Sequence, residues 1–143
     1  MIVLEDIIQV KHIDREGKKF DKVSRIDCKS ETYDMELVVD INTDIYPVGL
    51  NDKLSFALAT NLQDGVPDTG SYNPQPESTL LDSYDYAMHG KVYKWVEEKD
   101  KGPNGLVAVY VSFGGLLTMI KGDPRHLKEV KPDGSLYLLI RKV

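Results

Sequence analysis

The chain has little cysteine and no long hydrophobic run, and each absence excludes a class of protein. Cys28 is the only cysteine among 143 residues, which excludes an intramolecular disulfide and a zinc site built from several cysteines. This usage fits a reducing compartment, and we expect Cys28 to be a buried, inert thiol. The longest apolar run, Leu106 to Val111, falls far short of the roughly 20 residues of a membrane-spanning helix and predicts a buried strand. Glu5 and Asp6 interrupt the N-terminus early, so we expect no signal peptide and no membrane partner.

Groups suited to catalysis or metal binding are also sparse. The acidic stretches at 40–44 and 82–85 lack the ligand period of a calcium-binding loop. Gly114-Gly115 lacks the Gly-Lys-Ser/Thr ending of a phosphate-binding loop. The histidines lie far apart, without cysteines or paired carboxylates at ligand spacing, so we interpret them as ordinary surface or strand residues: His12, His89 and His126. We therefore predict no catalytic residue, no metal and no cofactor.

Charge is distributed unevenly along the sequence. The formal net charge is -5, yet residues 11–29 hold seven Lys/Arg and four Asp/Glu, whereas residues 30–90 hold one Lys and eleven Asp/Glu. An acidic protein repels free nucleic acid at long range, so any contact with it should be local and modest. The acidic middle could face a basic partner or could be a solvated surface.

The apolar pattern is typical of an all-β protein. Residues 35–41 and 54–58 alternate with the period of two of a strand that buries one face. Further strands are expected at 84–96, at 106–120 with a break at Gly114-Gly115, and at 135–142. Seven or eight strands separated by turns favour an antiparallel barrel, which we expect to form a single domain over 1–143. The Gly- and Pro-rich stretch 63–82 predicts a long loop.

Several motifs occur together in a characteristic order. The run LEDIIQVKHIDREGKKFDKVSRIDC at 4–28 is followed by Asp40-Ile41-Asn42, Ile45-Tyr46-Pro47-Val48, Tyr72-Asn73-Pro74, Met88-His89-Gly90-Lys91-Val92-Tyr93, Tyr110-Val111-Ser112-Phe113-Gly114-Gly115-Leu116-Leu117 and Leu136-Tyr137-Leu138-Leu139. In this order the motifs resemble the small OB-fold subunit shared by eukaryotic nuclear RNA polymerases I, II and III, the eighth subunit in conventional order.

The resemblance implies both a fold and a function. It implies an OB-type β-barrel interrupted by an Ω-like loop around residues 63–82. It also implies a non-catalytic assembly subunit that docks on the largest polymerase subunit in the nucleus, including the nucleolus. The resemblance to these subunits also implies weak, non-specific binding of single-stranded DNA through residues 14–38.

One basic cluster offers chemistry for nucleic-acid binding. Cations at these positions could meet phosphates while an aromatic ring stacks on an unpaired base: Lys18, Lys19, Lys22 and Arg25 around Phe20. Glu16 and Asp21 dilute this charge, so a solvated turn is an equally good interpretation.

Two segments are candidates for partner docking. Gly114 and Gly115 leave room for another chain, and the apolar residues beside them could contact it: Phe113, Leu116 and Leu117. An internal bend that closes the barrel explains the same glycines equally well. Tyr93 and Trp95 are candidate aromatic anchors, although aromatic residues in a strand more often belong to the core.

Three functions follow from these features. The leading hypothesis is a polymerase assembly subunit. An independent OB protein that binds single-stranded nucleic acid is disfavoured by net acidity and by the single aromatic residue in the basic cluster. A small barrel enzyme or ligand carrier is disfavoured by the lack of a catalytic constellation.

Overall fold

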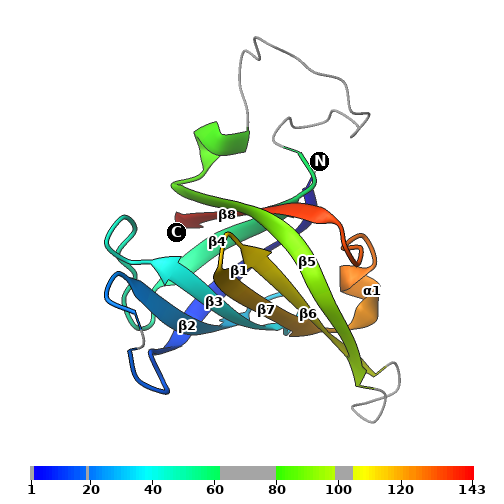
Figure 1. Ribbon diagram of the computed structural model, residues 1–143, viewed down its shortest axis with the longest axis horizontal. Helices are drawn as coiled ribbons and strands as arrows, with labels where there is room; N and C mark the ends of the chain where they lie inside the picture. Colours follow the sequence, from blue (N-terminus) through cyan, green and yellow to red (C-terminus); the bar gives the residue numbers. More distant parts are fainter. Residues whose placement is uncertain (1, 19, 62–79, 99–104) are drawn as a thin grey trace.

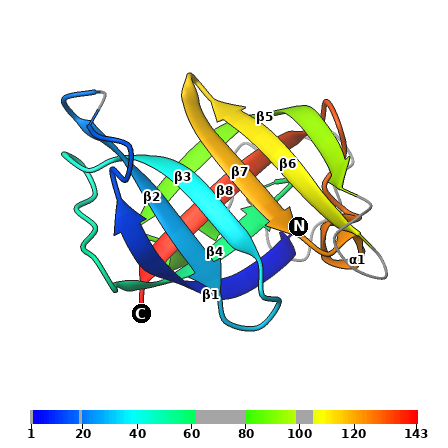
Figure 2. The ribbon, with the colours of Figure 1, turned by 90° about the horizontal axis from the view of Figure 1, so that it is seen from below.

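The computed structural model describes every residue except 1, 19, 62–79 and 99–104. Its described part contains eight strands: β1 (Ile2–Ile13), β2 (Val23–Ser30), β3 (Glu36–Asn42), β4 (Lys53–Ala59), β5 (Tyr86–Glu98), β6 (Leu106–Phe113), β7 (Leu116–Gly122) and β8 (Ser135–Lys142). They close into a barrel in the order β1-β2-β3-β7-β6-β5-β8-β4, and every neighbouring pair is antiparallel (Figures 1 and 2). The predicted all-β antiparallel barrel is confirmed.

Two short helices interrupt the strands within the described residues. η1 (Leu80–Ser83) is a 3₁₀ turn that precedes β5, and α1 (Pro124–Leu127) follows β7. Asp123 caps α1 by accepting a hydrogen bond from the Arg125 N–H, and Pro124 starts the helix where no N–H is needed. Neither helix is long enough to cross a membrane. The predicted loop over 63–82 falls mostly on residues outside those described, and its end forms η1.

The barrel interior is apolar, as the strand periodicity predicts. Met35, just before β3, and Leu37, Val39 and Ile41 within it are at most 1% exposed, which confirms the alternation predicted for residues 35–41. Cys28 is also buried, as predicted, and burial raises the pKa of its thiol to about 12.

One prediction about burial is wrong. The alternation in β4 predicts a single buried face, but the strand is buried on both faces from Leu54 to Ala59. Ala57 and Ala59 form a second small cluster with Leu139, against which Ile2, Tyr84 and Tyr137 pack. Alanine side chains are short enough to lie under larger side chains on the outside of the barrel.

Two features adjust the strands locally. β6 and β7 join at Gly114 and Gly115, whose φ angles of 63° and 99° suit glycine in a tight hairpin turn. The pairing of β5 with β6 shifts between Val92 and Lys94, so Tyr93 lies in a β-bulge, a feature that redirects a side chain.

Candidate functional site

The loop between β1 and β2 is anchored by Asp14. The Asp14 N–H donates to the Arg25 carbonyl oxygen at 2.8 Å, and the Arg25 N–H donates to Asp14 Oδ1 at 3.0 Å. The Gly17 N–H closes the loop on the Asp14 carbonyl oxygen at 2.8 Å. Asp14 has a φ of 49°, which an Asx side chain tolerates better than most. These bonds hold the start of the loop, from Asp14 to Gly17, against Arg25 of β2.

A groove of about 360 Å³ lies between this loop and the outer faces of β2 and β3. Its apolar lining comes from Phe20, Val23 and Val38. Its charged lining comes from two arginines and four carboxylates: Arg15, Arg25, Asp14, Glu16, Asp27 and Asp40. The described residues of the lining therefore carry an excess of two negative formal charges.

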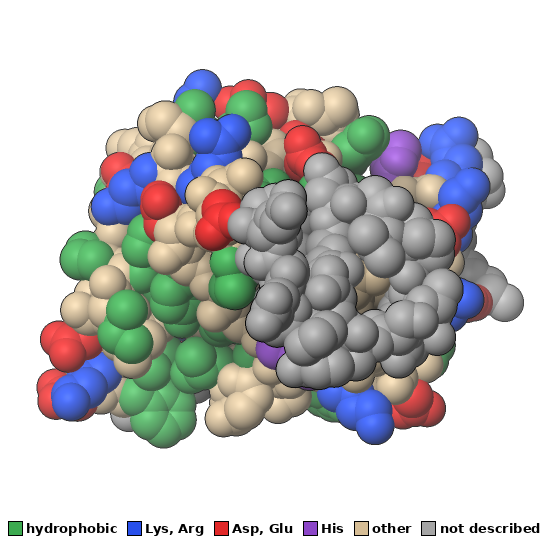
Figure 3. Space-filling model, turned by 90° about the horizontal axis from the view of Figure 1, so that it is seen from above, with side chains coloured by type: hydrophobic (Ala, Val, Ile, Leu, Met, Phe, Trp, Pro, Cys, Tyr) green, Lys and Arg blue, Asp and Glu red, His purple; other side chains and the backbone are tan. Residues whose placement is uncertain are grey.

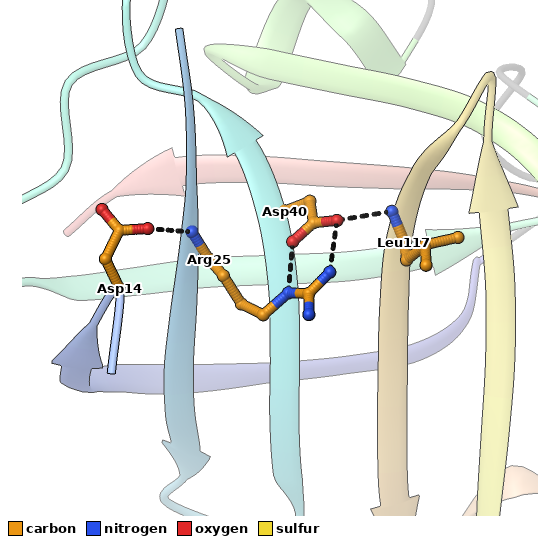
Figure 4. A network of polar contacts seen from close by, with 4 residues as sticks. All are labelled: Asp14, Arg25, Asp40 and Leu117. Atoms are coloured by element: carbon orange, nitrogen blue, oxygen red, sulfur yellow. Dashed lines mark hydrogen bonds and ion pairs between the residues drawn. The ribbon is translucent and has the colours of Figure 1, made fainter. Parts of the chain in front are cut away.

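A buried carboxylate joins three strands beside the groove (Figure 4). Asp40 of β3 accepts hydrogen bonds from Arg25 Nε at 2.7 Å and Arg25 Nη2 at 3.1 Å. Its Oδ2 also accepts the Leu117 N–H of β7 at 2.9 Å. Asp40 is 4% exposed although it lies on the outer face. The hydrogen bond that Arg25 donates to Asp40 raises the pKa of the guanidinium.

The described members of the predicted nucleic-acid site differ in exposure and in their contacts. Phe20 is 63% exposed and Lys22 is exposed, whereas Lys19 lies outside the described residues. Lys18 Nζ donates to Ser24 Oγ at 3.4 Å, and Arg25 is paired with Asp40. On the face drawn in Figure 3, Lys and Arg side chains lie beside Asp and Glu side chains. A phosphate in the groove would meet more carboxylates than free cations.

The predicted docking residues of the β6–β7 hairpin separate into two groups. Phe113 is 5% exposed and belongs to the core, and Leu116 packs against the core. Leu117 is 40% exposed on the outside. A Cβ on Gly114 or Gly115 would meet nothing within 4 Å, so the turn is open to solvent. The apolar contact predicted for Phe113 is therefore internal, because the strand alternation turns its side chain inward.

The two predicted aromatic anchors also differ. Tyr93 is 50% exposed because the bulge places it outside, with its ring centroid 6.2 Å from that of Tyr110. Trp95 is partly buried and packs against the core. This agrees with the alternative interpretation from sequence, in which an aromatic residue in a strand belongs to the core.

Strand register brings Leu117 and Tyr93 onto one face. On the outside of the barrel Val38 pairs with Met119, and Met119 pairs with Tyr110. Tyr110 in turn pairs with Lys94, next to Tyr93. We call this row the outer strip: Val38, Met119, Tyr110 and Tyr93, with Leu117 beside Met119. Sequence reasoning missed Val38, Met119, Tyr110 and Asp40, although their alternation with core residues marks them as outward-facing.

Comparison with known proteins identifies close relatives along the whole chain. A family model described as RNA polymerase Rpb8 matches residues 5–142. The chain is 45% identical over 144 residues to DNA-directed RNA polymerases II, IV and V subunit 8B of Arabidopsis thaliana, covering 100% of this chain and 97% of that protein. It is 46% identical over 143 residues to a probable DNA-directed RNA polymerases I, II, and III subunit RPABC3 of Caenorhabditis elegans, covering 99% and 96%. Identity to the Saccharomyces cerevisiae subunit RPABC3 is 39% over 149 residues, covering 98% and 97%.

Proposed function

Because the chain belongs to the RNA polymerase Rpb8 family, we propose that it is a structural subunit of DNA-directed RNA polymerases that supports DNA-templated transcription. The observation that carries this function is the match along 5–142 to proteins named as shared polymerase subunits. The same match supports treating 1–143 as one OB-type domain. The place of action is the nuclear transcription machinery, and we extend the proposal to the nucleolus.

The subunit is proposed to be non-catalytic. The described barrel interior is filled by apolar side chains from all eight strands, so these side chains occupy the centre of the barrel. The groove lies outside the barrel, and its arginines are paired with carboxylates. Nucleotidyl transfer would then belong to other subunits, with this chain holding one part of the assembly together. Its main contact is proposed to be the largest subunit.

Binding of single-stranded DNA stays a secondary proposal. It is supported by exposed Phe20 next to exposed Lys22, and weakened by the pairing of Arg25 with Asp40. Neutralising Lys18, Lys19 and Lys22 together, with Arg25 left in place, should lower the slope of log affinity against log salt by up to about 0.7 per lost phosphate contact. An unchanged slope would exclude these lysines as phosphate contacts. The alternative, an independent protein that binds single-stranded nucleic acid, is not favoured, because the relatives of this chain are named as polymerase subunits.

Purification from nuclear extract tests the proposed function. A tagged chain should recover the polymerase subunits in stoichiometric amount at moderate salt, identified by mass spectrometry. Cross-linking within the purified complex should then join the chain to the largest subunit. A chain that elutes alone and binds single-stranded DNA tightly would overturn the assembly function. Cross-links confined to other subunits would retain it and reject the largest subunit as the main contact.

A further inference from the structure

The outer strip crosses four neighbouring strands on one side of the barrel. β3, β7, β6 and β5 lie side by side in that order (Figures 1 and 2). Matched register aligns Val38, Met119 and Tyr110, and the bulge in β5 adds Tyr93 next to Lys94, the residue that pairs with Tyr110. With strands about 4.8 Å apart, the row extends roughly 15 Å before side chains are counted. Val38 also lines the groove, so strip and groove form one continuous surface.

Exposure and shape suit this surface to protein contact. Phe20 at one end is 63% exposed, Tyr93 at the other is 50% exposed, and Leu117 between them is 40% exposed. Large apolar and aromatic side chains of this kind anchor protein interfaces when a partner covers them. The bulge at Tyr93 adds an outward aromatic residue at a point where regular pairing provides none.

Three cations around the strip have partners within the protein. Lys121 contacts Glu98 at 2.9 Å, and Lys29 contacts Asp34 at 3.1 Å. Lys94 Nζ lies 5.3 Å from the centroid of the Tyr110 ring. Among the described residues that line the groove, carboxylates outnumber arginines by two. An occupant that matches both parts is apolar over the strip and carries a cation at the groove.

We propose that the groove and outer strip form one docking surface for a segment of another polymerase subunit that presents apolar side chains and a Lys or Arg. The cation would lie among the groove carboxylates, and the apolar side chains would cover Met119 and Leu117. This inference rests on the proposed function and deepens it by assigning the surface and the chemistry of its partner. Nucleic acid is the poorer match, because phosphate would face the acidic groove.

The test replaces outward apolar residues by lysine. A variant carrying Leu117→Lys and Met119→Lys places two cations on the strip without removing a core side chain. The matched control carries Ile45→Lys and Leu50→Lys, which are 72% and 58% exposed in the loop from β3 to β4. Thermal melting of each isolated chain checks folding. Affinity purification then measures the polymerase recovered per tagged chain.

We expect the strip variant to recover at least about tenfold less polymerase at an unchanged melting temperature, while the control recovers wild-type amounts. Equal recovery by the strip variant would overturn the docking surface and leave the proposed function intact. Stronger binding of single-stranded DNA by the strip variant together with unchanged polymerase recovery would assign the surface to nucleic acid instead. Failure of the wild-type chain to recover polymerase would overturn both proposals.

A second measurement covers the case in which the lysine variant melts early. A photo-cross-linking phenylalanine analogue at Tyr93, and separately at Phe20, leaves the strip in place. We expect both positions to cross-link to the same polymerase subunit, with the analogue at Leu50 as the control. Cross-links to nucleic acid, or to no polymerase subunit, would reject the proposed docking surface.

Discussion

Replacing Asp40 by asparagine tests the network that joins β2, β3 and β7. The carboxylate accepts two hydrogen bonds from Arg25 and one from the Leu117 N–H. Asparagine has nearly the same shape but only one acceptor oxygen, and its NH₂ group would face a donor. The variant therefore keeps the packing and removes the charge and at least one acceptor.

The expected loss of stability follows from these three contacts. A hydrogen bond to a charged group contributes about 1.5–3 kcal/mol when it is shielded from water. The side chain of Asp40 is 6% exposed, so the Leu117 contact keeps most of this value. The side chain of Arg25 is 39% exposed and can be rehydrated, so its pairing contributes at most about 1 kcal/mol. We expect Asp40→Asn to lower the free energy of unfolding by about 2–3 kcal/mol.

Urea and thermal unfolding of the isolated chain measure this loss. For a chain of this size the melting temperature should fall by roughly 6–12 °C. A double-mutant cycle with Arg25→Met should show coupling of about 0.5–1 kcal/mol, since the two residues share the same contacts. A free energy of unfolding within about 0.5 kcal/mol of wild type would refute the argument that Asp40 holds the three strands together.

Three further predictions concern the interior. The Thr118 hydroxyl is buried and has no hydrogen-bond partner among the described residues, so Thr118→Val should raise the free energy of unfolding by about 1 kcal/mol. A lower free energy of unfolding in urea would indicate that the hydroxyl has a partner. Burial raises the pKa of Cys28 from 9.0 to about 12. Between these pH values only the unfolded chain releases the thiol proton, so the free energy of unfolding falls as pH rises, by up to about 1.4 kcal/mol per pH unit. The free energy of unfolding of Cys28→Val should fall less steeply over this range, and parallel pH profiles of the two proteins would contradict this. A Cβ at Gly90 would lie 2.0 Å from the Ser112 carbonyl oxygen, so Gly90→Ala should lower the free energy of unfolding by about 3 kcal/mol or more, measured by thermal melting. The comparison is Gly114→Ala, whose Cβ meets no atom within 4 Å but whose backbone is strained by its positive φ.

Most strands could be predicted from sequence because their signal is local. The alternation through Met35 and Ile41 reports one inward face, and the structure buries those residues almost completely. The turn at Gly114 and Gly115 was predictable for the same reason, since two adjacent glycines allow positive φ. The double burial of β4 was not predictable, because it depends on which residues cover Ala57 from outside the barrel.

The candidate site was harder to predict because its residues meet only through strand pairing. Asp40 and Leu117 are 77 positions apart, yet one hydrogen bond joins them. No local pattern indicates that β3 lies beside β7, since chain order alone would place β3 next to β4. The bulge at Tyr93 also depends on the partner strand, because it is defined by a shift in register.

Arg25 shows how pairing changes a functional interpretation. In sequence it belongs to a group of cations around Phe20, which is the pattern expected for phosphate contacts. In the barrel its guanidinium bonds to Asp40, and the carboxylates of the groove outnumber its arginines. A phosphate at Arg25 would lie beside the Asp40 carboxylate, whose Oδ1 is 2.7 Å from the guanidinium, whereas an apolar partner segment can cover the neighbouring strip without bringing a second anion to the pair. The same observation that weakens nucleic-acid binding thus favours protein docking on this face.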